Sequence, residues 1–140
     1  MKVNPHFPDP VYVSVSLGPS DFNQRRMLKR MRYFMAHDAA EPVIVPKGSV
    51  TDYASIPRIF WPFLPPWGRY GPAAIVHDYL YARAAMTVPD PDNPSRMIES
   101  DRKVPDRIFL LTMAQLGVGP VKRYVMYFAV RLFARSAYQS

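Results

Sequence analysis

The chain has 140 residues, a hydrophobic fraction of 49% and a formal net charge of +7. This length allows one domain with a single core, and this hydrophobic fraction argues against intrinsic disorder. The lack of cysteine excludes a disulfide framework and a thiolate metal site, and it fits a reducing compartment or a particle assembled in one. The positive charge favours a polyanionic partner such as nucleic acid or anionic lipid, unless it only forms solvated faces.

The amino-terminal part, about residues 11–50, predicts a small antiparallel sheet. The run VYVSVSL, residues 11–17, alternates apolar and polar side chains and predicts a half-buried strand. Residues 26–36, RMLKRMRYFMA, suit a helix by composition and a strand by alternation. We favour a strand, because a turn-like segment follows and then the short β run VIVPKGSV, residues 43–50.

The segment TDYASIPRIFWPFLPPWGRYG, residues 51–71, is rich in proline and aromatic residues. A flexible linker would not carry so many rings, so we expect an ordered loop packed on the core. Its rigid side chains, above all Trp61 and Trp67, also suit a docking surface for a partner.

Three helices are predicted in about residues 72–138, at 72–86, 105–117 and 120–137. The proline- and aspartate-rich residues 87–104 predict an exposed loop or insertion. The fold class is therefore α+β: one domain over residues 1–140, with the sheet first, the ring-rich loop between, and the helices last.

The last helix carries aromatic and basic residues together. Its rings are expected in the core, and the alternative is a basic amphipathic face that docks on a partner protein or on lipid; the rings are Tyr124, Tyr127, Phe128 and Phe133. Three cations interrupt its apolar run, so it does not resemble a membrane span. The amino terminus lacks the pattern of a signal peptide, and we expect a soluble protein.

The candidate site lies in GPAAIVHDYLY, where His77 and Asp78 stand side by side. Helical spacing places His77 on the same face as Ala73, Leu80 and Tyr81, and Asp78 one step around at the border of the core. A histidine there can be a general base, and the adjacent carboxylate can hold a hard cation. The alternative is a hydrogen-bonded core histidine beside a solvated aspartate.

Two polar residues of the ring-rich loop are further candidates. Asp52 can complete a ligand set with Asp78, or it can be a turn residue whose side chain accepts backbone N–H groups. Arg58 can bind a substrate or phosphate, or pair with a carboxylate such as Asp52. On the first helix, Tyr81 is expected to pack, with its hydroxyl or that of Tyr79 reaching a polar partner, and it is also a candidate contact to substrate or partner.

Most of the chain, about residues 45–133, resembles a family of small phage and prophage proteins with a domain of unknown function. The resemblance rests on four motifs: VPKGSVTDYASIPRIFW, GRYGPAAIVHDYLY, DRIFLLTMAQLGV and RYVMYFAVRLF. Tyr53 departs from the glycine usual after Asp52. The resemblance implies a virion-associated bacteriophage protein of the tail or baseplate, assembled in the host cytoplasm with other phage structural proteins.

A His-Asp-x-x-Tyr helix followed by a later helix with an aspartate is similar to the core of secretory phospholipases of the A-two class. That resemblance implies His77 as general base, Asp78 as calcium ligand and Asp106 as the carboxylate that orients the imidazole. The disulfides and the glycine-rich calcium loop of those enzymes are missing.

The sequence thus leaves three functions. The first is a virion component, with or without a hydrolase-like site. The second is a hydrolase that uses calcium or zinc and acts on lipid, cell wall or another ester or amide. The third is a basic nucleic-acid-binding protein.

Overall fold

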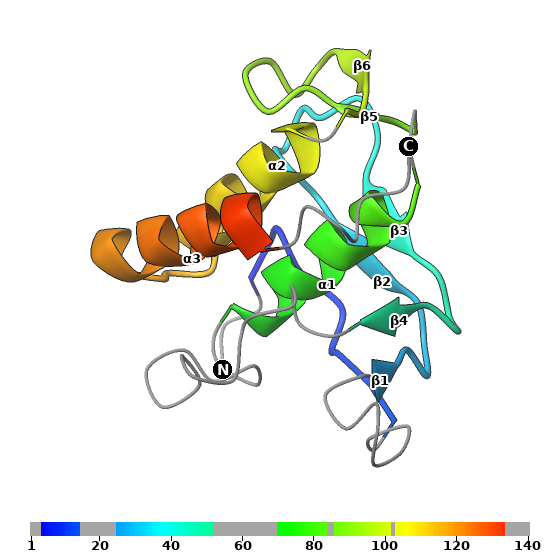
Figure 1. Ribbon diagram of the computed structural model, residues 1–140. Coiled ribbons are helices and arrows are strands. Elements are labelled where there is room, and N and C mark those ends of the chain that lie inside the picture. Colours follow the sequence, from blue (N-terminus) through cyan, green and yellow to red (C-terminus); the bar gives the residue numbers. More distant parts are fainter. Residues whose placement is uncertain (1–3, 15–24, 52–69, 84–85, 102, 134–140) are drawn as a thin grey trace.

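The computed structural model describes residues 4–14, 25–51, 70–83, 86–101 and 103–133 of the chain. Within them the fold is α+β, with short antiparallel strand pairs and three helices, as the sequence predicted (Figure 1). None of the described helices is long and apolar enough to cross a lipid bilayer.

The amino-terminal β region consists of two antiparallel pairs. Strand β1 (Arg25–Arg26) pairs with β4 (Val50–Thr51), and β2 (Met31–Tyr33) pairs with β3 (Val43–Val45). The strand prediction for residues 26–36 is therefore confirmed over its short strands, although two separate pairs replace the single sheet. The strand forms here because apolar and polar side chains alternate, so that every second side chain from Met31 to Met35 is buried in the core.

The predicted strand at residues 11–17 is wrong over its described part. Residues 11–14 contribute one bridge, between Val13 and Met27, and Val11 and Tyr12 are exposed. Two backbone bonds flank this bridge, from Ser14 N to Arg26 O and from Leu28 N to Tyr12 O. Alternation alone could not show that this segment pairs too briefly to bury a face. Residues 15–17 lie outside the described part.

Helix α1 (Gly71–Tyr81) lies at the centre of the fold, between the strands and the other helices (Figure 1). Pro72 stands in its first turn, as predicted. The helix ends at Tyr81 and not near Met86, and the N–H of Ala82 caps it by donating to the carbonyl of Asp78. The sequence of α1 is almost continuously apolar, which suits a helix covered by strands on one face and by helices on the other.

Residues 87–99 form a hairpin, so the predicted exposed loop is confirmed for the turn, where Asp92, Asn93 and Ser95 are exposed, and is wrong for the strand at Thr87–Pro89. Strand β5 (Thr87–Pro89) pairs antiparallel with β6 (Met97–Glu99), and Val88 is buried. The turn is held by Asp90, which pairs with Arg96 and accepts the N–H of Asp92. Strands of three residues are too short to show a clear alternation of apolar and polar side chains in the sequence, and the prolines around them predict a loop.

Helices α2 (Lys103–Gln115) and α3 (Pro120–Phe133) pack against each other (Figure 1). Helix α2 begins two residues earlier than predicted, because Asp101 Oδ1 accepts the N–H groups of Lys103 and Val104. It ends before Gly117, whose φ of 82° is the left-handed conformation that favours glycine at this position.

Two clusters of buried side chains form the core on either side of α1. One joins α1 to α2 and α3, and includes Ala73, Phe109 and Met126. The other joins the opposite face of α1 to the strands, and includes Ile75, Leu80 and Tyr33.

The expectation that the rings of the last helix lie in the core is wrong for two of them. Tyr124 and Phe128 are exposed, and α3 is anchored instead by Met126, Ala129 and Val130. Tyr127 is half-buried, and the side chain of Phe133 lies outside the described part. Both faces of α3 carry apolar residues, so the sequence could not show which one meets the core.

Candidate functional site

His77 lies in the interior, on the side of α1 that faces α2. Its side chain has no accessible surface. The ring packs between two aromatic neighbours, with centroids 4.2 Å from Tyr81 and 5.0 Å from Phe109. Tyr81 stands four residues further along α1, one turn away on the same face, and Phe109 belongs to α2. Both neighbouring rings are tilted against the imidazole, by 36° for Tyr81 and 41° for Phe109.

Asp106 of α2 is the partner of this imidazole. His77 Nε2 lies 2.7 Å from Asp106 Oδ1, and the Asp106 side chain is also fully buried. The same oxygen accepts the hydroxyl of Tyr81 at 2.6 Å, and the other oxygen accepts Arg131 Nη1 from α3 at 2.7 Å. Three helices therefore converge on one carboxylate, and each contributes a donor or the acceptor.

The charges in this network support one another. Burial alone would raise the pKa of Asp106, but its bonds to His77, Tyr81 and Arg131 lower it overall, so Asp106 is an anion. An ionised carboxylate can only accept, which makes Nε2 of His77 the donor. Burial alone would lower the pKa of His77, but the bond to Asp106 and the charges of Asp78 and Asp106 raise it overall.

The other ring nitrogen of His77, Nδ1, is buried and has no hydrogen-bond partner within the described part of the chain. The nearest carboxylate oxygen, Oδ1 of Asp78, lies 3.7 Å away, which is too long for a hydrogen bond. Asp78 thus acts on His77 as a nearby charge, as expected for adjacent helix residues whose side chains diverge.

Thr51 of β4 holds the Asp78 side chain in place. The Thr51 hydroxyl donates to Asp78 Oδ2 at 2.5 Å, and only 14% of the Asp78 side chain is accessible. Strand β4 therefore braces the carboxylate beside Nδ1, while α2 and α3 brace the carboxylate at Nε2.

This arrangement has the elements of a general base. One nitrogen is fixed as a donor to an anionic carboxylate, and the opposite nitrogen presents a free lone pair when the ring is neutral. A carboxylate that stabilises the imidazolium makes proton uptake at Nδ1 easier. An unpartnered polar atom inside a protein is costly, so Nδ1 requires either a partner outside the described residues or a role beyond packing.

The predicted site residues divide into two groups. His77, Asp78, Tyr81 and Asp106 come together, and the hydroxyl of Tyr81 reaches a polar partner as expected. The others lie outside the described residues: Asp52, Arg58, Trp61 and Trp67.

The predicted cation site therefore stays a prediction. Asp78 is the described member of the proposed ligand pair, and Asp52 is not described. In the described ranges, no group of three His, Asp or Glu side chains is placed to hold a metal ion.

Sequence reasoning missed the contributions of Thr51 and Arg131. Arg131 is 25 residues from Asp106 and Thr51 is 27 residues from Asp78, so no local spacing connects them. For Arg131 the signal was chemical, because it is a charged donor in an otherwise apolar stretch, whereas Thr51 stands among other polar residues and gave no signal.

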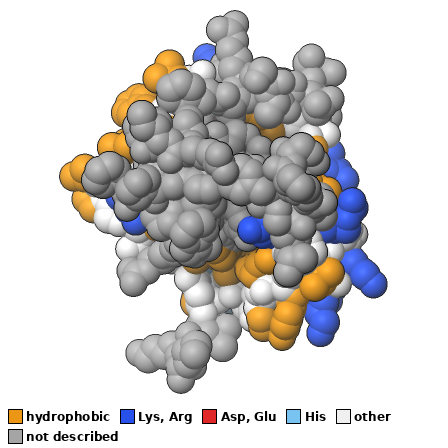
Figure 2. Space-filling view, turned by 60° about the horizontal axis from the view of Figure 1, so that its bottom comes forward, with side chains coloured by type: hydrophobic (Ala, Val, Ile, Leu, Met, Phe, Trp, Pro, Cys, Tyr) orange, Lys and Arg blue, Asp and Glu red, His pale blue; other side chains and the backbone are white. Residues whose placement is uncertain are grey.

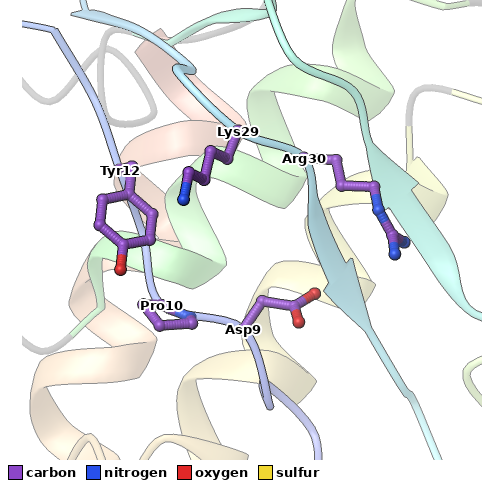
Figure 3. Close-up of a pocket in the computed structure, with 5 residues that line it drawn as sticks. All are labelled: Asp9, Pro10, Tyr12, Lys29 and Arg30. Carbon is purple, nitrogen blue, oxygen red and sulfur yellow. The ribbon is translucent and has the colours of Figure 1, made fainter.

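A surface cavity of about 310 Å³ lies apart from His77, beside the chain that enters β2 (Figure 3). Its lining residues are Asp9, Pro10, Tyr12, Lys29 and Arg30. The Lys29 ammonium lies 4.7 Å from the centre of the Tyr12 ring, and Asp9 is neutralised by Arg32. The described site residues, His77, Asp78, Tyr81 and Asp106, do not line this cavity.

Comparison with known proteins identifies one match. Residues 26–130, well over half of the chain, match a family model described as a protein of unknown function (DUF1353). The matched range contains His77, Asp78 and Asp106 and ends one residue before Arg131. No curated protein and no solved structure matches the chain.

Proposed function

The chain belongs to the DUF1353 family of proteins of unknown function, and we propose that it is a hydrolase in which His77 activates water. The observation that carries the proposal is the buried imidazole, which Asp106 holds at Nε2 and which has no hydrogen-bond partner at Nδ1 among the described residues.

In the proposed reaction, Nδ1 of His77 takes a proton from water as the water oxygen bonds to the carbonyl carbon of an ester or amide. The imidazolium is stabilised by Asp106, and it returns the proton to the leaving oxygen or nitrogen as that bond breaks. Tyr81 and Arg131 act through Asp106 as positioning residues, because each donates to it and keeps it ionised and aligned. Since Nδ1 is buried, the neighbouring residues must open before water can reach it.

The test is hydrolysis of a panel of soluble short-chain esters and amides by the wild type and by His77→Gln. Positioned general bases contribute about 10²–10⁴-fold to the rate, so the variant should lose about that much. His37→Gln is the matched control, since His37 is exposed and lies in a turn. The wild-type rate should rise with pH through the raised pKa of His77, because only the neutral ring is a base.

Two outcomes would reject the proposal. Equal rates for wild type and His77→Gln, with both shown to be folded by circular dichroism, would leave His77 a structural residue. A wild type inactive on every member of the panel, with and without added calcium or zinc, would do the same.

A second candidate function is that of a virion component of a bacteriophage tail or baseplate, and it is compatible with the first. Its support is the resemblance of the motifs to small phage proteins together with the net charge of +7. Mass spectrometry of purified particles tests it directly: the protein should be found there in a fixed copy ratio to the tail proteins.

A further inference from the structure

The outer face of α3 is a continuous apolar stripe. Its five side chains fall at spacings of three, four and seven residues, which places them on one side of the helix. Their exposed fractions are high for such residues: Val121 80%, Tyr124 46%, Val125 48%, Phe128 58% and Leu132 72%. Figure 2 shows hydrophobic side chains gathered at the edge of the molecule where α3 lies in Figure 1.

In the described part of the chain, the contact of α3 with the core is made by Met126, Ala129 and Val130, on another side of the helix from the stripe. Single exposed apolar residues are ordinary, but a contiguous stripe of five marks a surface that something else covers.

The charges of α3 indicate what that partner is. The helix contains no acidic residue, and besides Arg131, which pairs with Asp106, it carries Lys122 and Arg123 next to the stripe. In a dimer formed through α3, these cations would repel the same cations of the second copy. An apolar surface bordered by negative charge would instead attract them. A helix with an apolar face and flanking cations is the type that lies in the interface of an anionic bilayer.

We propose that the apolar stripe of α3 docks on an anionic lipid bilayer. This docking does not depend on the proposed hydrolase function.

The contacts of Arg131 connect the stripe to the site. Arg131 precedes Leu132 and follows Phe128 by three residues, so it borders the stripe. Its guanidinium donates to Asp106, which binds His77. The stripe is thus separated from Nε2 of the imidazole by two side chains, whereas Nδ1 lies on the other edge of the ring, beside Asp78.

The experiment is co-sedimentation of the full chain with vesicles of phosphatidylcholine, with and without phosphatidylglycerol. The wild type should bind the anionic vesicles, and Phe128→Ser/Leu132→Ser should bind at least tenfold more weakly. The matched control is Leu28→Ser/Ile44→Ser, which removes two similarly exposed apolar side chains elsewhere and should bind as the wild type. All four side chains are exposed, so both variants should keep the wild-type melting temperature.

Several results would overturn the docking proposal. These are no binding of wild type to anionic vesicles, equal binding by the stripe variant, or a dimer in sedimentation velocity that Phe128→Ser/Leu132→Ser dissolves. The last would assign the stripe to a second copy.

The failure of either proposal would be distinguishable. Hydrolysis of soluble esters without vesicle binding would reject docking and leave the hydrolase standing. Vesicle binding by wild type and His77→Gln alike, with no hydrolysis of phospholipid or soluble ester, would reject the hydrolase and leave docking standing.

Discussion

Replacing Asp106 with asparagine should strongly destabilise the protein, because three donors converge on this carboxylate. The change keeps the shape of the side chain but removes its charge and turns one oxygen into an NH₂ donor. If the NH₂ group lies toward Arg131, it faces a group that can only donate. If it lies toward His77 and Tyr81, the ring must change tautomer for Nε2 to accept, and the charge pairing with the carboxylate is lost.

The magnitude follows from burial. Removing one partner of a buried, hydrogen-bonded ion pair costs about 3–5 kcal/mol, and the side chains of Asp106 and His77 have no accessible surface. Arg131 is 24% accessible, so solvent screening reduces its share. For a chain of 140 residues, an unfolding entropy of about 2.1 cal/mol/K per residue converts this loss into a fall in Tm of about 10–17 °C.

The assay is thermal and urea unfolding followed by circular dichroism at neutral pH. Asp38→Asn is the matched control: it is the same substitution at an exposed turn position and should change stability by no more than about 0.5 kcal/mol. An Asp106→Asn protein as stable as the control would show that the carboxylate carries no buried charge, and the reasoning on the His77 network would be refuted.

Three further predictions concern stability. The pKa of His77 is raised above 6.5 in the folded state, so the stability that His77 contributes is complete below pH 6.5 and is lost as the pH rises through the folded pKa. The free energy of unfolding, measured by urea titration, should therefore fall over that pH range. Asp106→Asn should flatten this dependence of the unfolding free energy on pH. Thr51→Val should cost about 1.5–3 kcal/mol, the contribution of a hydrogen bond to a charged group, because it removes the donor to Asp78; Thr51→Ser should restore most of it in the same urea assay. Gly48→Ala should cost about 1–2 kcal/mol for the left-handed backbone, since φ is 92° and an added Cβ would meet nothing within 4 Å; an unchanged urea midpoint would contradict this.

Local patterns in the sequence determined the type of most elements. Alternation identified the strands near Met31 and Val43, and Pro72 and Pro120 marked the starts of two helices. The four-residue spacing of His77 and Tyr81 placed both on one helix face, and they do pack against each other. Each of these properties depends on residues close by in the sequence, which is why composition and periodicity can predict them.

The tertiary structure alone decided which distant groups meet. Residue chemistry gave no reason to pair His77 with Asp106, 29 positions away, and only the resemblance to phospholipases suggested it. The packing of α3 against α2 brings Arg131 to the same carboxylate, and the path of β4 brings Thr51 to Asp78. It also decided which apolar side of α3 is covered. Periodicity reports that a helix has an apolar face, but only the neighbouring elements determine whether that face lies in the core or in solvent.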